Sequence, residues 1–247
     1  MIRKLIFAIV ITLTGTGFLL PGNITIYLAG DSTIATKSTA AFPETGWGTP
    51  FATFFDASVT VDNRAMNGRS TGSFIKENRW QGIAGDLREG DYVFIQFGHN
   101  DEVPTKKTYT TERDFKANLT RFVIETRSKN AHPVLITPVA RRKFNDKGEI
   151  EGTHDRYSEL VRQVADSLHT PLIDLDRKSQ QLYQQLGAEA SALLFVHLEP
   201  GEHPNYPDGK TDNTHFNELG ARKIAQLVLA DIRALGLGLT ERIIKKK

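Results

Sequence analysis

The chain has 247 residues, of which 39% are hydrophobic and 24% charged, a profile typical of a globular protein with a single sizeable core. Its 31 Lys and Arg residues against 29 Asp and Glu residues give a formal charge of +2. Two of the basic residues, Arg3 and Lys4, lie at the N-terminus, so the rest of the chain has 31 − 2 = 29 basic and 29 acidic residues. This balance argues against a nucleic-acid partner. The chain has no cysteine, so no disulfide contributes to its stability.

The first 22 residues have the pattern of a secretory signal peptide. A basic pair precedes an apolar run that begins at Leu5, and small residues follow from Gly15. Threonines interrupt the run, which is shorter than the roughly 20 apolar residues that a membrane-spanning helix requires. We therefore expect residues 1–22 to be cleaved and residues 23–247 to form a single domain. The mature protein is expected in the periplasm or the extracellular medium, without stable membrane insertion.

Five short, nearly continuous apolar runs rich in β-branched residues have the length of strands buried on both faces. They are residues 24–29, 59–62, 92–97, 134–139 and 172–175. Helical periodicity is found from Phe115 to Val123, from Tyr157 to Leu168, and from Leu219 to Leu235, each with one apolar face. Strands that alternate with helices indicate crossover connections. The sequence thus predicts an α/β fold, a three-layer α/β/α sandwich with a five-stranded parallel sheet.

Polar motifs that carry chemistry follow the first three predicted strands. Ser32 lies in the motif Gly-Asp-Ser-Thr after the first strand, Gly68 follows the second, and Asn100 follows the third. Asp212 and His215 lie just before the last predicted helix. Ligands of open α/β sheets bind beyond the carboxyl ends of the strands, so we expect these segments to meet at that edge.

Together these residues match the requirements of acyl transfer. A serine hydroxyl needs a general base, the base needs a carboxylate to orient it, and the oxyanion that forms needs hydrogen-bond donors. Ser32, His215 and Asp212 fit the first three roles. The backbone N–H groups of Ser32 and Gly68 and the side-chain amide of Asn100 fit the fourth.

In this order, Ser32, Gly68, Asn100 and His215 resemble the four sequence blocks for which the SGNH, or GDSL, hydrolase family is named. The resemblance covers essentially the whole chain after residue 22. It implies the flavodoxin-like fold of these hydrolases, with Ser32 as nucleophile, His215 as base and Asp212 as its partner. It also implies that Ser32, Gly68 and Asn100 form the oxyanion hole, and that no metal or organic cofactor takes part.

Four segments resemble more narrowly the rhamnogalacturonan acetylesterase branch, carbohydrate esterase family 12. They are residues 28–33, 98–101, 212–216 and the loop 199–207. This resemblance implies that the partner is an acetylated polysaccharide, and that the activity is hydrolysis of O-acetyl esters on a pectic chain. The same chemistry on another polysaccharide such as xylan, or on small acyl esters, is the alternative within the enzyme class.

Several arginine and tryptophan residues are candidates for substrate contacts. Arg69 and Arg141 fall at the active edge of the predicted sheet, where a planar guanidinium would suit galacturonate carboxylates. Arg142 is interpreted as surface charge. Trp47 and Trp80 remain unassigned, because a lone tryptophan near a helix start more often belongs to the core.

Three other interpretations compete with the triad. Residues 68–72 fit a G-x-S-x-G nucleophile elbow with Ser70 as nucleophile, although such an elbow would lie unusually early in the chain. A carbohydrate-binding protein that has lost its chemistry is the non-enzymatic alternative. A zinc site is the third, although its residues match no established ligand spacing. Those residues are His197, His203, Asp212 and His215.

Overall fold

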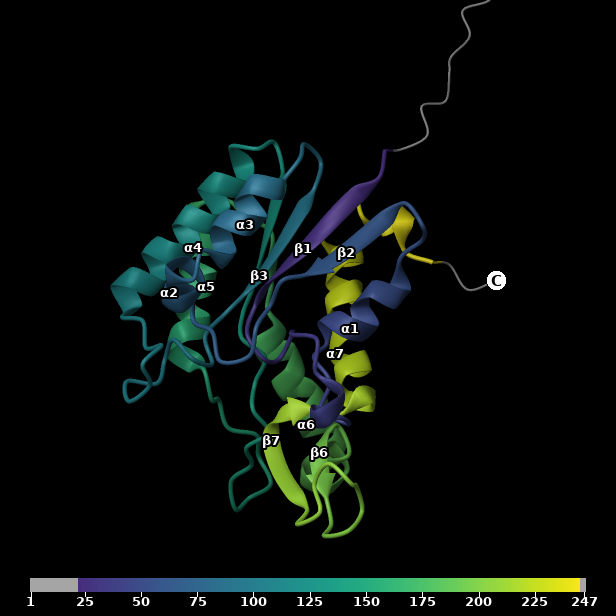
Figure 1. The fold of residues 1–247 in the computed structure, drawn as a ribbon. Helices are drawn as coiled ribbons and strands as arrows, with labels where there is room; N and C mark the ends of the chain where they lie inside the picture. Colours follow the sequence, from purple (N-terminus) through teal and green to yellow (C-terminus); the bar gives the residue numbers. More distant parts are fainter. Residues whose placement is uncertain (1–21, 245–247) are drawn as a thin grey trace, which may run out of the picture.

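The computed structural model describes residues 22–244, so the predicted signal peptide, apart from its last residue, lies outside the described part of the chain. Five parallel strands form the central sheet in the order β2-β1-β3-β4-β5 (Figure 1). The strands are β1 (Ile24–Gly30), β2 (Val59–Asn63), β3 (Tyr92–Gln96), β4 (His132–Ile136) and β5 (Leu172–Ile173). The predicted five-stranded parallel sheet is therefore confirmed.

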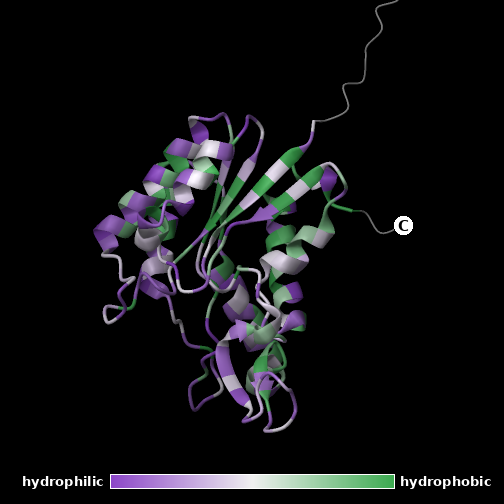
Figure 2. Cartoon of the chain, viewed as in Figure 1, coloured by the Kyte–Doolittle hydropathy of each residue, from purple (hydrophilic) through white to green (hydrophobic). Residues whose placement is uncertain are grey.

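The inner strands are buried on both faces, as their nearly continuous apolar runs require, whereas the edge strand β2 is only partly buried. Alternate residues of β1 show this directly, because Ile26 and Leu28 pack in one hydrophobic cluster and Tyr27 and Ala29 in another. Figure 2 shows the same distribution, with hydrophobic residues along the strands and polar residues on the outer sides of the helices.

Helices cover the two faces unequally. One face packs against α2 (Thr71–Lys76), α3 (Arg79–Asp86), α4 (Glu112–Arg127) and α5 (Asp155–Ser167). The other packs against α1 (Gly48–Phe51), α6 (Leu175–Ala192) and α7 (Glu218–Ala234). Short 3₁₀ turns occupy Thr39–Ala41, Ala52–Phe54 and Thr240–Arg242. The three predicted helices correspond to α4, α5 and α7, and the three-layer arrangement is confirmed.

Local signals explain where α7 begins and ends. Asn217 is the N-cap, and its side-chain oxygen accepts a hydrogen bond from the Gly220 N–H at 3.0 Å. Past the C-terminal end, Gly236 has a φ of +61°, a backbone conformation that favours glycine. Among the described residues, no helix is long and apolar enough to cross a membrane.

From residue 172 onward, the observed elements differ from the predicted ones in two places. The strand predicted at 172–175 ends at Ile173, because Asp174 caps α6 and Leu175 begins it. Two further strands, β6 (Phe195–Leu198) and β7 (Lys210–Phe216), pair antiparallel outside the main sheet (Figure 1). Asp212 and His215 therefore lie on a strand that the sequence did not predict, and this strand ends at Phe216, just before α7 begins at Glu218.

Candidate active site

The side chains of Ser32, His215 and Asp212 form one continuous hydrogen-bonded chain. The Ser32 hydroxyl lies 3.0 Å from His215 Nε2, and His215 Nδ1 lies 2.8 Å from Asp212 Oδ2. Burial by itself would raise the pKa of the Asp212 carboxyl, but hydrogen bonds from His215 and Thr214 lower that pKa well below its ordinary range. Asp212 is thus an ionised acceptor. It favours the imidazole tautomer with the proton on Nδ1, which leaves Nε2 to accept from Ser32.

Strand β7 and its anchors hold Asp212 and His215 in place. Asp212 Oδ1 accepts hydrogen bonds from the backbone N–H groups of Thr214 at 2.8 Å and His215 at 2.9 Å. Between them, the Asn213 side-chain oxygen accepts from Arg142 Nη1 at 2.8 Å, and the Arg142 N–H donates to the Asn213 carbonyl at 2.8 Å. Arg142, which the sequence suggested to be surface charge, is therefore a structural anchor of the strand that carries the base.

Ser32 lies directly after β1 in a tight turn. The Asp31 carboxylate accepts from the Thr33 N–H and hydroxyl, both at 2.9 Å, and the Ala35 N–H donates to the Asp31 carbonyl at 3.1 Å. Gly30 is required for space and not for a positive φ. A Cβ at Gly30 would lie 2.7 Å from the Gln96 carbonyl oxygen and 2.3 Å from the Ile34 side chain.

The three predicted oxyanion donors lie on neighbouring segments. The Met66 N–H donates to the Gly30 carbonyl at 3.0 Å, and the Asn100 Nδ2 donates to the Arg69 carbonyl at 3.1 Å. The loop that carries Gly68 is thereby tied to the end of β1 and to the segment after β3. Gly68 has a φ of +76°, and a Cβ there would meet nothing within 4 Å, so its glycine is needed for backbone conformation alone.

Each of the three predicted oxyanion donors has an N–H hydrogen that no protein group accepts within the described residues. Within residues 22–244, the backbone N–H groups of Ser32 and Gly68 have no hydrogen-bond acceptor. The Asn100 amide gives one of its two hydrogens to Arg69 O, while its oxygen accepts from Lys106 Nζ at 2.9 Å. The Lys106 contact fixes the amide orientation with the second Nδ2 hydrogen available.

A bridge of charged side chains, Lys37, Glu44 and Lys210, flanks the base and was not predicted. Glu44 Oε1 lies 4.0 Å from His215 Nε2 and 2.7 Å from Lys37 Nζ. Lys210 Nζ lies 3.4 Å from Glu44 Oε2 and also 3.4 Å from Asp212 Oδ2. Burial opposes ionisation of Glu44, but the hydrogen bond from Lys37 and the nearby positive charges hold its pKa below the usual value.

The bridge also reaches the oxyanion loop, because Lys37 Nζ donates to the Asn67 side-chain oxygen at 2.8 Å. The only sequence signal for this arrangement was the spacing of Lys210 and Asp212. Residues two apart on a strand share a face, but that strand was not predicted.

The arginines proposed to contact substrate are both engaged within the protein. Arg69 pairs with Glu77 at 3.0 Å, and Arg141 Nη1 pairs with Glu102 Oε1 at 2.9 Å. The same Glu102 oxygen lies 2.9 Å from His154 Nδ1. Arg69 and Arg141 therefore have carboxylate partners before any substrate is bound.

The structure also places the residues of the alternative interpretations, namely Ser70, the two tryptophans and the possible metal site. Ser70 is fully buried and is the N-cap of α2, where its hydroxyl accepts from the Ser73 N–H at 3.1 Å and from Thr110 at 3.2 Å. Trp47 and Trp80 are both fully buried, so neither presents a surface to a sugar. In the described part of the chain, no group of three or more His, Asp or Glu side chains is arranged to hold a metal ion.

Comparison with known proteins identifies the family of the chain. Residues 28–223 match the GDSL-like lipase/acylhydrolase family. Rhamnogalacturonan acetylesterase RhgT of Bacillus subtilis (strain 168) is 45% identical over 225 residues, which cover 91% of this chain and 96% of RhgT. The probable rhamnogalacturonan acetylesterase YesY of the same organism is 37% identical, over 90% of this chain and 98% of YesY.

A solved structure extends the comparison to the fold. The crystal structure of Bacillus subtilis YxiM superposes with a TM-score of 0.77 at 26% identity, covering 87% of this chain and 58% of that chain. The family predicted from the four sequence blocks is thus confirmed. The chain belongs to the GDSL-like lipase/acylhydrolase family and is a carboxylic ester hydrolase.

Proposed function

We propose that the protein removes O-acetyl groups from a pectic polysaccharide, with Ser32 as nucleophile, His215 as general base and Asp212 as the carboxylate that orients it. The observation that carries the proposal is the pair of short contacts on the two sides of the His215 ring, 3.0 Å to Ser32 Oγ and 2.8 Å to Asp212 Oδ2. They join residues 183 positions apart in the sequence into the arrangement that serine acyl transfer needs.

The reaction follows from these contacts. As Ser32 Oγ attacks the acetyl carbonyl, its proton passes to His215 Nε2 and the carbonyl oxygen becomes an oxyanion. When the intermediate collapses, the sugar oxygen leaves with the proton from Nε2, and the acetyl group stays on Ser32. A water molecule then attacks the acetyl-enzyme by the same steps, giving acetate and free Ser32.

The charges that develop have counterparts in the site. The oxyanion is met by the Ser32 N–H, the Gly68 N–H and the second hydrogen of the Asn100 amide. The positive charge on His215 is balanced by ionised Asp212, with the Glu44 carboxylate 4.0 Å from the other ring nitrogen. No step in this sequence requires a metal or an organic cofactor.

The choice of a pectic substrate rests on the relatives. Two proteins that align over nine-tenths or more of this chain are named as rhamnogalacturonan acetylesterases, one of them as probable. We infer that the acetylated partner is of the same class.

We also propose that residues 1–22 direct export of the protein. The test is immunodetection of the protein in the periplasmic and extracellular fractions of the native host, compared with a variant that lacks residues 1–22.

The decisive experiment measures acetate release from acetylated rhamnogalacturonan, homogalacturonan and xylan. The wild type is expected to act fastest on the rhamnogalacturonan, and Ser32→Ala to be inactive on all three. Ser128→Ala, which changes an exposed serine on another face, is the matched control and should retain full activity. Preference for xylan would refute the pectic assignment. Polysaccharide binding without acetate release would indicate a non-catalytic binding protein.

A further inference from the structure

The oxyanion loop, residues 64–70, contains a residue pair with a chemistry of its own, Asn67 and Gly68. They form the only Asn-Gly pair in the sequence. The side chain of an asparagine cyclises when the backbone nitrogen of the next residue attacks its amide carbon, and a glycine in that position has no Cβ to hinder the approach. Both residues are exposed, and a Cβ at Gly68 would meet nothing within 4 Å. The approach to the Asn67 side chain is therefore open.

The nitrogen that would attack is free of other hydrogen bonds. The Gly68 N–H has no acceptor among residues 22–244, so no contact has to break before this nitrogen reacts. Asp208 and Gly209 form the only Asp-Gly pair, where the same cyclisation is chemically possible. There the glycine N–H is occupied, because it donates to the Tyr206 carbonyl at 2.9 Å. The two pairs are therefore not equivalent.

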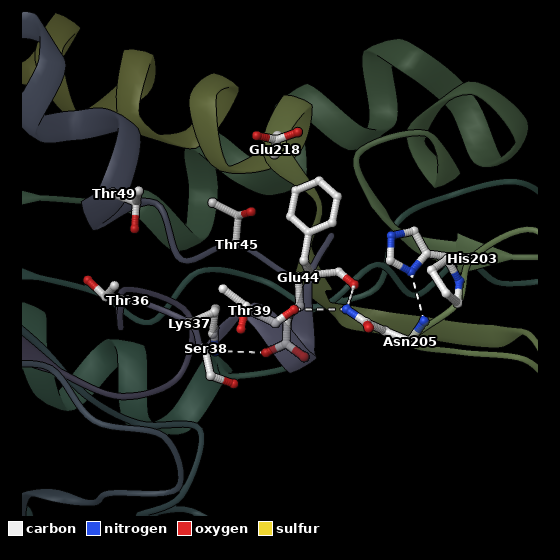
Figure 3. A pocket seen from close by; sticks show the side chains of 12 residues that line it. Thr36, Lys37, Ser38, Thr39, Glu44, Thr45, Thr49, His203, Asn205 and Glu218 are labelled. Carbon is white, nitrogen blue, oxygen red and sulfur yellow. Dashed lines mark hydrogen bonds and ion pairs between the residues drawn. The ribbon is translucent and has the colours of Figure 1, made fainter.

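Two cations polarise the groups that would react. Arg69 Nη1 donates to the Asn67 backbone carbonyl at 2.9 Å, and this carbonyl shares one peptide group with the Gly68 N–H, which becomes more acidic. Lys37 Nζ donates to the Asn67 side-chain oxygen at 2.8 Å and makes the amide carbon more electrophilic. Figure 3 shows Lys37 in the wall of the neighbouring pocket, and its side chain is only 5% exposed, so solvent screens its charge little. The loop thus activates both reacting groups.

We propose that Asn67 is a site of spontaneous modification that inactivates the enzyme as it ages. The Gly68 nitrogen forms a bond to the Asn67 amide carbon and loses its proton. The bond from that carbon to the side-chain nitrogen breaks, and ammonia leaves with the proton. The product is a cyclic succinimide. Water then opens the ring at either carbonyl and leaves aspartate or isoaspartate in place of Asn67.

The modification affects catalysis because the attacking nitrogen is also a proposed oxyanion donor, and in this respect the inference rests on the proposed function. The succinimide has no N–H at this nitrogen, so the transition state loses one of its three donors. Isoaspartate lengthens the backbone by one methylene group and moves the donor. Loss of one donor typically lowers kcat by about a hundredfold to a thousandfold, so these two forms would contribute almost nothing to the measured rate.

The test incubates the purified full-length protein at mildly alkaline pH and follows two quantities over time. Peptide mass spectrometry measures the fraction of Asn67 that is converted, and a small chromogenic acetate ester measures kcat and KM. We expect kcat to fall in proportion to the succinimide and isoaspartate fractions, with KM unchanged. Conversion should be faster at higher pH, because the attacking nitrogen must lose its proton. The peptides with Asn130 and Asn145, which Ala and Asp follow, are internal controls and should stay unmodified.

Three variants separate this chemistry from ordinary loss of activity. Asn67→Gln has a longer side chain that would have to close a larger ring, so it should retain its own starting activity over the same period. Lys37→Met removes the cation from the amide oxygen and should slow the conversion of Asn67 severalfold, as measured by mass alone. Ser128→Ala, on another face, should lose activity at the wild-type rate. Circular dichroism during the incubation checks that the protein stays folded.

The possible results have distinct meanings. If Asn67 stays unmodified, or if Asn67→Gln loses activity as fast as the wild type, the modification site is refuted. Conversion of Asn67 without a fall in kcat would refute the link to the oxyanion donor. Faster conversion in Lys37→Met would overturn the activating role of Lys37. Failure of the proposed function is distinguishable, because fresh enzyme would then release no acetate from rhamnogalacturonan, while peptide mass and small-ester turnover could still be followed.

Discussion

Replacing Glu44 by Gln removes one negative charge beside the proposed base and keeps the side-chain volume. The Glu44 carboxylate lies 4.0 Å from His215 Nε2, the atom that receives the Ser32 proton. In the variant, Lys37 and Lys210 lose their shared partner while Lys210 stays 3.4 Å from Asp212. A positively charged His215 is therefore less favoured, both in the resting enzyme and in the transition state.

The size of the effect follows from the distance. Two unit charges separated by 4.0 Å interact by about 1 kcal/mol in water and by about 4 kcal/mol at an effective dielectric constant of 20. The His215 side chain is 27% exposed and the Glu44 side chain 11% exposed. Because solvent screens the pair and the two lysines offset part of the Glu44 charge, the interaction energy is taken from the lower end of this range. About 1.4 kcal/mol corresponds to a tenfold fall in kcat. It also corresponds to a shift of about one pH unit in the midpoint of the acidic limb.

The assay is the pH dependence of kcat and kcat/KM with a small acetate ester. Activity requires neutral His215, so a less favoured imidazolium moves the half-maximal pH of kcat/KM downward while the plateau of kcat falls. Lys210→Met should move the half-maximal pH upward. Glu159→Gln, on the exposed side of α5, is the matched control. A lower kcat with an unmoved half-maximal pH would refute the electrostatic argument, because a purely structural role of Glu44 predicts that result.

Three further predictions concern the proposed catalytic residues. Ser32→Ala should abolish ester hydrolysis and leave the melting temperature unchanged. Ser70→Ala should leave kcat intact and lower the melting temperature, because it removes a helix cap worth about 1 kcal/mol. The reverse pattern would support Ser70 as the nucleophile. Asn100→Ala should lower kcat by about a hundredfold to a thousandfold with little change in KM, and a fall below tenfold would argue against its oxyanion role. Because hydrogen bonds keep the pKa of Asp212 well below its ordinary range, Asp212 stays ionised from acidic to neutral pH. Activity should therefore rise with pH in a single step to which Asp212 does not contribute, and Asp212→Asn should lower the plateau without adding a second step. Stopped assays across the acidic to neutral range would check this, and activity independent of pH would contradict it.

The sequence predicted the parts of the fold that depend on local pattern. In the run 92–97 every position except Gln96 is apolar, because both faces of the sheet are covered there, and β3 is buried along its whole length. The helices from Glu112 and from Asp155 were predicted because one apolar face recurs every three to four residues. Strands β6 and β7 and helix α6 were not predicted. Helix α6 is polar over much of its length and is interrupted at Gly187, where φ is +75°.

The family and the order of the proposed catalytic residues were also readable from the sequence. The four blocks follow strands or precede a helix, and parallel strands bring their carboxyl ends to one edge. The conformation of each block is set by its own residues. Gly68 has the positive φ that favours glycine, and the Asp31 carboxylate closes the turn after β1 by accepting from the Thr33 N–H. Asp212 lies three residues before His215, and the two meet because the Asp212 carboxylate also accepts from the backbone N–H groups of Thr214 and His215, which turns the chain locally.

Only the tertiary structure decided which charged groups surround the base and which arginines are already paired. Lys37, Glu44 and Lys210 lie in segments up to 173 residues apart, and no periodicity links them, so their contacts exist only after the loops pack. For the same reason the sequence located Arg69 and Arg141 at the active edge but did not reveal their partners Glu77 and Glu102. Local pattern follows from the backbone and the burial of apolar surface, whereas long-range pairing of polar side chains depends on where the whole chain places them.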